Sequence, residues 1–151
     1  MTEKQYFMKL KSLIMIMLGA AMLGGCCSAC KQRTKNAKPL EGTVWHLIQI
    51  EGRDVAPEAG TFDITLDGGR LSGIGACNRL MGSYTVEPKL GIRFGALAST
   101  RMMCPNVDME SQLAAVLESA THYDIDYDIL MIMQDGAIKA MFRAVTPAAE
   151  N

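Results

Sequence analysis

The sequence lacks several features that would each indicate a defined class of protein. Its 151 residues carry a formal net charge of −1 and only 6% aromatic residues, which excludes nucleic-acid binding by bulk electrostatic attraction. The main apolar run, Leu13–Leu23, is shorter than the roughly 20 residues that span the hydrocarbon core of a bilayer. There is no internal repeat, and the length allows one domain with a tail.

Histidine is also scarce, and this limits the chemistry that the cysteines can perform. A nucleophilic cysteine needs a base within reach, and the only histidines are His46 and His122. Cys77 with His122 is one possible catalytic pair. A zinc site formed by the two histidines with Cys77 and Cys104 would lack the short C-x-x-C or H-x-x-H spacing that preorganises such a site. We therefore expect no enzyme activity, catalytic residue, metal or cofactor.

The start of the chain has the pattern of an export signal. Basic residues precede the apolar run, which ends in Leu23-Gly24-Gly25-Cys26. This ending resembles the bacterial lipoprotein signal, in which the cysteine receives a diacylglycerol and becomes the mature N-terminus. The resemblance implies a signal peptide at residues 1–25, starting at Met1 or Met8, and acyl chains such as palmitate on Cys26. The alternative is an uncleaved anchor helix or a buried core helix.

Residues 26–39 read as a flexible basic tether between the lipid and the domain. Fourteen acidic residues outnumber eight basic ones in the following segment, 40–145. Such a tether either favours contact with anionic lipid or is merely a soluble spacer. Cys27 and Cys30 form a C-x-x-C without a βαβ context, so we expect no redox function there.

The segment from 40 to 145 has mainly the period-two patterning of strands. The strand candidates are residues 44–50, 62–67, 70–74, 83–86, 91–94, 123–127, 129–134 and 137–144. Asp67-Gly68-Gly69 and Asp135-Gly136 predict tight hairpin turns. In the last strand we expect Ile138, Ala140 and Phe142 to share one face.

One helix interrupts the strands. It opens at Pro105–Asp108 with acidic residues in its first turn, and its apolar residues recur at helical spacing through Ala120. We predict an α+β fold: a curled antiparallel sheet of about seven or eight strands, a partly open barrel, packed with one amphipathic helix. Residues 146–151 form a C-terminal tail.

Methionine is abundant, with 12 residues in the chain. In the predicted domain, methionines fall at positions that favour gap-filling in the core, and the alternative is an adaptable binding surface. The residues concerned are Met81, Met102, Met103, Met131, Met133 and Met141.

Two cysteines, Cys77 and Cys104, lie within the predicted domain. Export places them in an oxidising compartment, where such a pair usually forms a disulfide. Closing a loop of this length stabilises a domain by roughly 3–4 kcal/mol in the chain-entropy model. We therefore expect a structural bridge rather than a reactive thiol.

The residues around these cysteines resemble the META domain (HslJ-like) family. The matching elements are Trp45, Gly73–Asn78, Gly82-Ser83-Tyr84, Leu97–Pro105 and Glu110. The resemblance covers nearly the whole of 40–145. It implies an exported, often lipid-anchored protein associated with bacterial envelope stress, and it supplies no catalytic residues.

The residues of this motif predict two loops stapled together. Gly75 and Gly82 permit close approach of the backbone, and Asn78 can fold its amide onto nearby backbone. Thr100 and Arg101 precede the second cysteine, where a hydroxyl and a guanidinium could hold loop carbonyls. All of these residues receive a structural role in this interpretation.

The sequence thus favours a lipid-anchored bacterial envelope lipoprotein, attached to the outer membrane and facing the periplasm. Its domain would be monomeric and non-enzymatic, acting in envelope stress tolerance or in interaction with an envelope protein. The alternative is a small-ligand or inhibitor-binding domain in which the curled sheet cups an apolar molecule. An enzyme dependent on Cys77 is the least favoured hypothesis.

Overall fold

The computed structural model describes residues 36–145, and a compact unit begins at Ala37. The predictions for the signal peptide, Cys26, Cys27, Cys30 and the tail 146–151 lie outside the described residues. Within the described part, no helix has the length and apolarity needed to cross a membrane.

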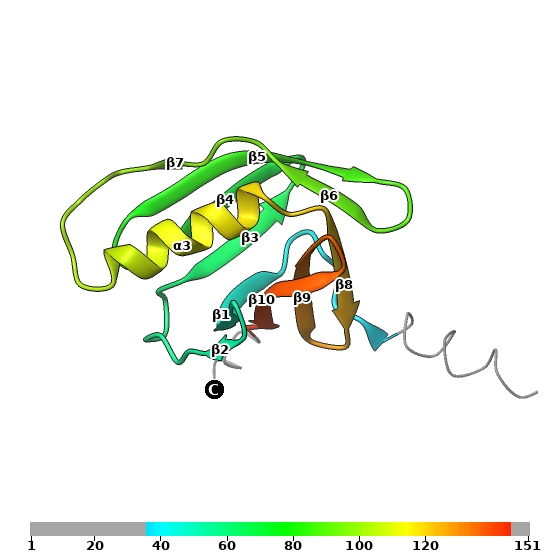
Figure 1. The fold of residues 1–151 in the computed structure, drawn as a ribbon, viewed down its shortest axis with the longest axis horizontal. Helices are drawn as coiled ribbons and strands as arrows, with labels where there is room; N and C mark the ends of the chain where they lie inside the picture. Colours follow the sequence, from blue (N-terminus) through cyan, green and yellow to red (C-terminus); the bar gives the residue numbers. More distant parts are fainter. Residues whose placement is uncertain (1–35, 146–151) are drawn as a thin grey trace, which may run out of the picture. The chain divides into compact units, whose positions relative to one another are not determined.

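Ten strands and one helix make up the described unit (Figure 1). The strands are β1 (Val44–Ile50), β2 (Arg53–Asp54), β3 (Asp63–Asp67), β4 (Arg70–Ile74), β5 (Arg79–Glu87), β6 (Gly91–Phe94), β7 (Ala98–Ser99), β8 (His122–Asp126), β9 (Ile129–Gln134) and β10 (Ala137–Ala144). The helix is α3 (Val107–Glu118). The predicted α+β class with one helix is confirmed, and the additional strands β2 and β7 are only two residues long.

The strands form one antiparallel sheet that curls until its first and last long strands pair. Their order is β10-β9-β8-β6-β5-β4-β3-β1-β2, and β10 also pairs with β1, for example Trp45 with Ala144. Strands β6 and β8 are joined at one residue pair only, Gly91 with His122. The sheet is therefore a ring with one weak join rather than a regular barrel.

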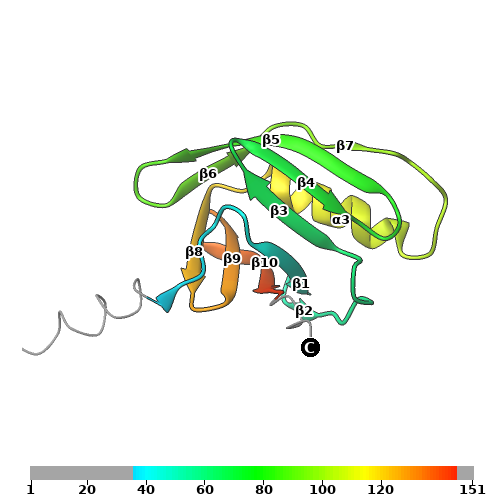
Figure 2. The same cartoon turned by 180° about the vertical axis from the view of Figure 1, so that it is seen from behind.

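The inner face of this ring is filled by apolar side chains. Trp45 and Leu47 of β1 and Phe142 of β10 are fully buried, as the alternation of these strands predicts. Helix α3 lies along one side of β3, β4 and β5 (Figures 1 and 2), and its residues Leu113 and Leu117 are buried in the same core. The concave side of the sheet thus holds the protein's own core.

Two strands differ from the expected pattern. A bulge between Ile138 and Ala140 shifts the register of β10 against β9, so Ile138 is exposed while Ala140 and Phe142 are buried. The prediction for Ile138 was wrong because one extra residue reverses the facing of a strand. Strand β5 begins at Arg79, earlier than expected, because its residues 79–83 pair with β4.

The methionines correct a second expectation. None of the methionines in the described part is fully buried, and Met81, Met102 and Met103 are exposed. Met131, Met133 and Met141 lie on the outer face of β9 and β10 and are half-buried. Gap-filling in the core is therefore wrong for these residues. Met81, Met131, Met133 and Met141 lie on strands whose opposite face is turned inward, and Met102 and Met103 lie in the segment between β7 and α3.

Candidate functional site

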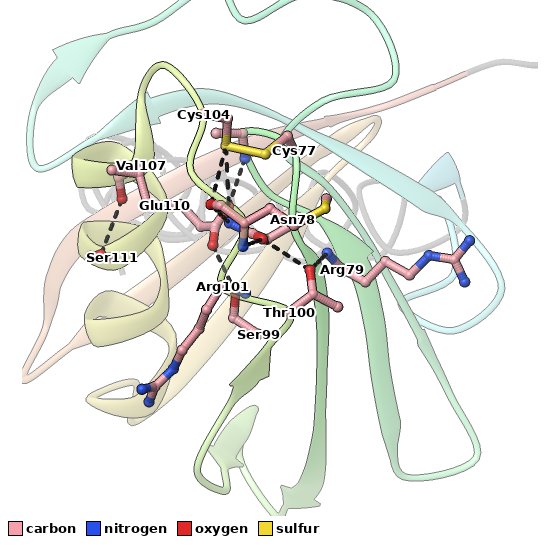
Figure 3. Close-up of a disulfide and its surroundings, with 12 residues drawn as sticks. Cys77, Asn78, Arg79, Ser99, Thr100, Arg101, Cys104, Val107, Glu110 and Ser111 are labelled. Carbon is pink, nitrogen blue, oxygen red and sulfur yellow. Dashed lines mark hydrogen bonds between the residues drawn. A yellow bond between two sulfur atoms is a disulfide. The ribbon is translucent and has the colours of Figure 1, made fainter.

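A disulfide joins the two motif segments on which the sequence analysis centred. Cys77 precedes β5 and Cys104 precedes α3, and their Cα atoms are 6.2 Å apart (Figure 3). The bridge holds the segment 95–106, called here the motif loop, against the start of β5. The motif loop contains only one short strand, β7, which pairs with β5 at Leu80 and Met81.

Asn78 supplies a second connection to the motif loop. Its side chain is fully buried, and its Oδ1 accepts hydrogen bonds from the Met102 N–H at 2.5 Å and the Thr100 hydroxyl at 2.9 Å. Its Nδ2 donates to the Met102 carbonyl at 3.2 Å. The amide does bind backbone, but that backbone lies in the motif loop and not nearby in sequence. A buried amide must find such partners, because an unsatisfied one is costly.

Thr100 and Arg101 differ in what they contribute. The Thr100 hydroxyl donates to Asn78 and accepts from the Arg79 N–H at 3.2 Å, so it links the loop to β5. The Arg101 side chain is exposed and points away from the disulfide (Figure 3). Its backbone has a φ of 54°, a left-handed conformation that is uncommon for a residue with a side chain. The structure therefore gives Arg101 no part in holding the loop carbonyls.

Glu110 is a buried carboxylate that the sequence analysis named as part of the family motif but to which it gave no role. It lies in the first turn of α3, and its Oε2 accepts the Ala76 N–H at 3.0 Å while its Oε1 accepts the Ser99 hydroxyl at 2.9 Å. The positive end of the helix dipole favours a carboxylate at this position. The sequence pattern that could have predicted its burial is its spacing from Leu113 and Leu117, which places Glu110 on the core-facing side of the helix.

Two motif glycines allow this packing. A Cβ on Gly75 would lie 2.4 Å from the Glu110 Oε2, so only glycine admits the carboxylate. A Cβ on Gly82 would lie 2.4 Å from a terminal methyl of Leu97, which is more able to move. Both residues thus have the close-approach role that the motif predicts.

Trp45 and Tyr84 lie apart from the motif loop and hold the start of the domain. The Trp45 indole donates to the Leu40 carbonyl at 3.0 Å, and the Tyr84 hydroxyl donates to the Glu41 carboxylate. Burial of the phenol, and then its hydrogen bond to Glu41, raise the pKa of Tyr84 to about 12. These two residues therefore fix the segment that enters β1.

A groove of about 700 Å³ lies between the motif loop and α3, and we call it the motif groove. Asn78 and Glu110 line it together with apolar residues. The apolar lining comes from Leu80, Leu97, Met102, Met103, Pro105, Val107 and Ala114. Met103 is fully exposed and Met102 is 52% exposed. The groove therefore combines buried polar residues with an exposed apolar rim.

The geometry around Cys77 is that of a bridge. Its sulfur is bonded within the disulfide, and the recorded ring contacts of the histidines go elsewhere, from His46 to Asp63 and from His122 to Thr121. Within residues 36–145, no group of three or more His, Cys, Asp or Glu side chains is arranged to hold a metal ion.

Comparison with known proteins agrees with this architecture. Among solved structures, the chain is similar to a protein from Burkholderia xenovorans determined by NMR, with 26% identity, a TM-score of 0.57, and coverage of 71% of this chain and 84% of that one. It also shares its fold with a DUF4847 family protein from Bacteroides vulgatus, at 15% identity and a TM-score of 0.53, covering 69% of this chain and 93% of that one. No match was found among curated proteins.

The family comparison covers the same region as the sequence motif. The model of the META domain matches residues 38–146, which is more than half of the chain and includes both cysteines, the motif loop and α3. The predicted family is confirmed, and the chain belongs to the META domain family.

Proposed function

We propose that this protein is a lipid-anchored envelope protein whose META domain binds a partner protein through the motif groove. The observation that carries the proposal is the exposed apolar rim of the groove, which Met102 and Met103 of the motif loop form. Exposed apolar side chains that gather in one place are typical of interaction surfaces.

The way the groove is held supports binding rather than a purely structural role. Below the rim, the disulfide and the buried side chains of Asn78 and Glu110 fix the motif loop in place. At the rim, methionine side chains are flexible and polarizable, so they adapt to an apolar surface. A fixed base reduces the entropy lost on binding, and a flexible rim provides the contact.

The expected occupant is an apolar segment of an envelope protein. Sites for small molecules usually enclose most of the ligand, whereas Met103 at this rim is fully exposed and would be covered only by a larger partner. The buried polar groups of the groove do not require hydrogen bonds from a partner, because no buried side-chain N or O atom in the described part lacks a hydrogen-bond partner.

Membrane attachment would place the groove near such partners. The lipoprotein-type ending at Cys26 supports a lipid anchor, and a basic segment separates it in sequence from the META domain. A function in envelope stress tolerance accords with what the family resemblance implies. Under this proposal the domain acts by contact and has no catalytic step.

Site-specific photo-crosslinking in cells tests the proposal. A benzophenone amino acid at position 103 should form one dominant adduct in the membrane fraction, whereas the same group at Val86, an exposed residue of β5 outside the groove, should not. Val107→Glu at the groove should abolish the adduct, and Val86→Glu should leave it unchanged.

The same experiment tests the anchor. Cys26→Ser should move the protein from the membrane fraction to the soluble fraction without altering its thermal unfolding. Equal adducts from positions 103 and 86, or an adduct that survives Val107→Glu, would contradict binding at the groove. Membrane attachment that persists after Cys26→Ser would contradict the lipid anchor.

A further inference from the structure

A second candidate site lies on the outer face of the sheet, where three charged or titratable residues form a row. His46 of β1 is paired in register with Arg143 of β10 on one side and with Asp63 of β3 on the other. Residues in register on adjacent strands share a face. Since Trp45 and Leu47 beside His46 are buried, this row lies on the outer face.

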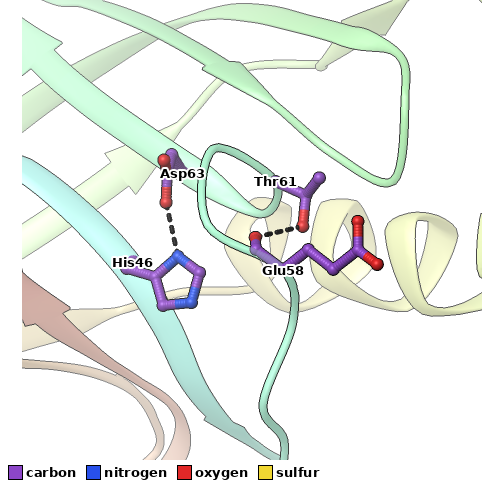
Figure 4. Close-up of polar contacts among 4 residues, drawn as sticks. All are labelled: His46, Glu58, Thr61 and Asp63. Atoms are coloured by element: carbon purple, nitrogen blue, oxygen red, sulfur yellow. Dashed lines mark hydrogen bonds and ion pairs between the residues drawn. The ribbon is translucent and has the colours of Figure 1, made fainter.

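The His46 ring is held in one orientation. Its Nδ1 lies 2.6 Å from Oδ1 of Asp63, and the side chains are 21% and 19% exposed. Figure 4 shows the ring with its other nitrogen, Nε2, directed away from Asp63. A carboxylate that orients one ring nitrogen leaves the other available to a ligand.

A pocket of about 350 Å³ adjoins this row, and we call it the outer pocket. Its polar lining is His46, Asp63 and Arg143, and its apolar lining includes Ile48, Pro57 and Val145. This volume is at the lower end of the range of small-molecule sites. One wall is the loop that precedes β3, so the pocket has both a charged side and an apolar side.

Arg143 has capacity for a further partner. Its only ion pair among the described residues is with Asp128, with Nε 3.8 Å from Oδ2, which is longer than a hydrogen bond. A guanidinium has five N–H donors and binds carboxylates with two of them. The other charged group of the pocket region, Glu58, directs its carboxylate away from His46 in Figure 4.

We propose that the outer pocket binds a small monocarboxylate with an apolar body. The Arg143 guanidinium and a protonated His46 Nε2 donate to the carboxylate, and the apolar body packs on Ile48, Pro57 and Val145. Asp63 balances the charge of the imidazolium. This inference is independent of the motif groove, which lies elsewhere on the domain and shares no lining residue with the outer pocket.

Binding of the carboxylate in the outer pocket should depend on pH. A ligand carboxylate that accepts a hydrogen bond from Nε2 binds the protonated form of His46, so affinity should be higher at pH 6 than at pH 8. The charged groups facing the imidazole are Asp63 and Arg143, with Asp128 behind the arginine.

The test uses octanoate and the two histidines of the full-length chain carrying Cys26→Ser. NMR signals of the His46 ring should shift and saturate with octanoate, while those of His122, exposed on β8 and outside the pocket, should stay unchanged. Octanol, which lacks the charge, should bind at least about tenfold more weakly, and octanoate affinity should rise from pH 8 to pH 6.

Matched variants identify the residues. Arg143→Gln should weaken octanoate binding at least about tenfold, whereas Arg93→Gln, which removes an exposed arginine of β6, should leave it unchanged. His46→Gln should remove the pH dependence. Equal shifts of both histidines, equal binding of octanol, or no shift of His46 at millimolar octanoate would each overturn the proposal.

Discussion

The β9–β10 hairpin and the motif loop are held in place by different kinds of interaction. The hairpin pairs along nearly its whole length, from Ala137 with Gln134 to Arg143 with Ile129, through backbone hydrogen bonds. The motif loop has two strand residues, and the rest depends on a disulfide, Asn78 and Glu110. A backbone ladder tolerates the loss of one side chain, whereas a loop held by side chains does not.

Among the changes that test this comparison, removal of the disulfide should lower the stability of the domain most. Cys77→Ser with Cys104→Ser should lower the free energy of unfolding by roughly 3–4 kcal/mol, since the unfolded chain is no longer cross-linked. Thermal and urea unfolding measure the change. Cys27→Ser with Cys30→Ser is the matched control and should leave stability unaltered. An equal loss in both double variants would remove the distinction between these cysteine pairs.

Asn78→Ala should have the next largest effect. It removes three hydrogen bonds to Thr100 and Met102 and leaves buried groups unsatisfied, so we expect a loss of about 2–3 kcal/mol. Gln134→Ala, at the end of β9, should change stability by less than about 0.5 kcal/mol. Hydrogen exchange of the Met102 amide should accelerate in Asn78→Ala only. A larger loss from Gln134→Ala would reverse the comparison.

The smallest expected effect concerns Tyr84, which lies on the strand that pairs with both β6 and the motif loop. Its pKa is raised to about 12, so the folded state favours the neutral phenol. An unfolded tyrosine ionises near pH 10, so this contribution is complete below about pH 10 and is lost as pH rises toward 12. Urea unfolding of the wild type should show an additional loss of about 1–2 kcal/mol between these values.

Tyr84→Phe is the control for that measurement. Because other groups also titrate at high pH, the difference between the two proteins isolates the phenol. This difference should shrink as pH rises. A difference that stays constant from pH 8 to pH 11.5 would show that the hydrogen bond to Glu41 does not couple ionisation of Tyr84 to folding.

The contrast also explains what the sequence could predict. Alternation and turn chemistry are local, so the strands β9 and β10 and the Asp135-Gly136 turn were predicted nearly as observed. The bulge at Ile138 was not, because a one-residue register shift leaves no mark on the hydrophobic pattern. The error over the methionines of β9 has a related cause, because Met131 and Met133 alternate just as the buried residues Leu130 and Ile132 do.

The motif groove was harder to predict for a different reason. The motif and the family indicated that Cys77, Asn78 and Thr100 belong together, but the hydrogen bond that the Ala76 N–H donates to Glu110 joins residues far apart in the sequence. No local periodicity encodes a contact of this kind. The pocket beside His46 likewise depends on strand order, which brings β10 and β3 to either side of β1.

The pairing of β1 with β10 has a consequence for how the chain acquires its structure. Trp45 and Ala144 are partners although they lie near opposite ends of the domain, so the sheet cannot close until almost the entire domain is available. Long-range pairings of this kind slow folding, because the entropy of a large loop is lost before the contacts form. A polypeptide emerging from the ribosome therefore cannot form the β1–β10 pairing until its last strand has been synthesised, so closure of the sheet is a late event in folding.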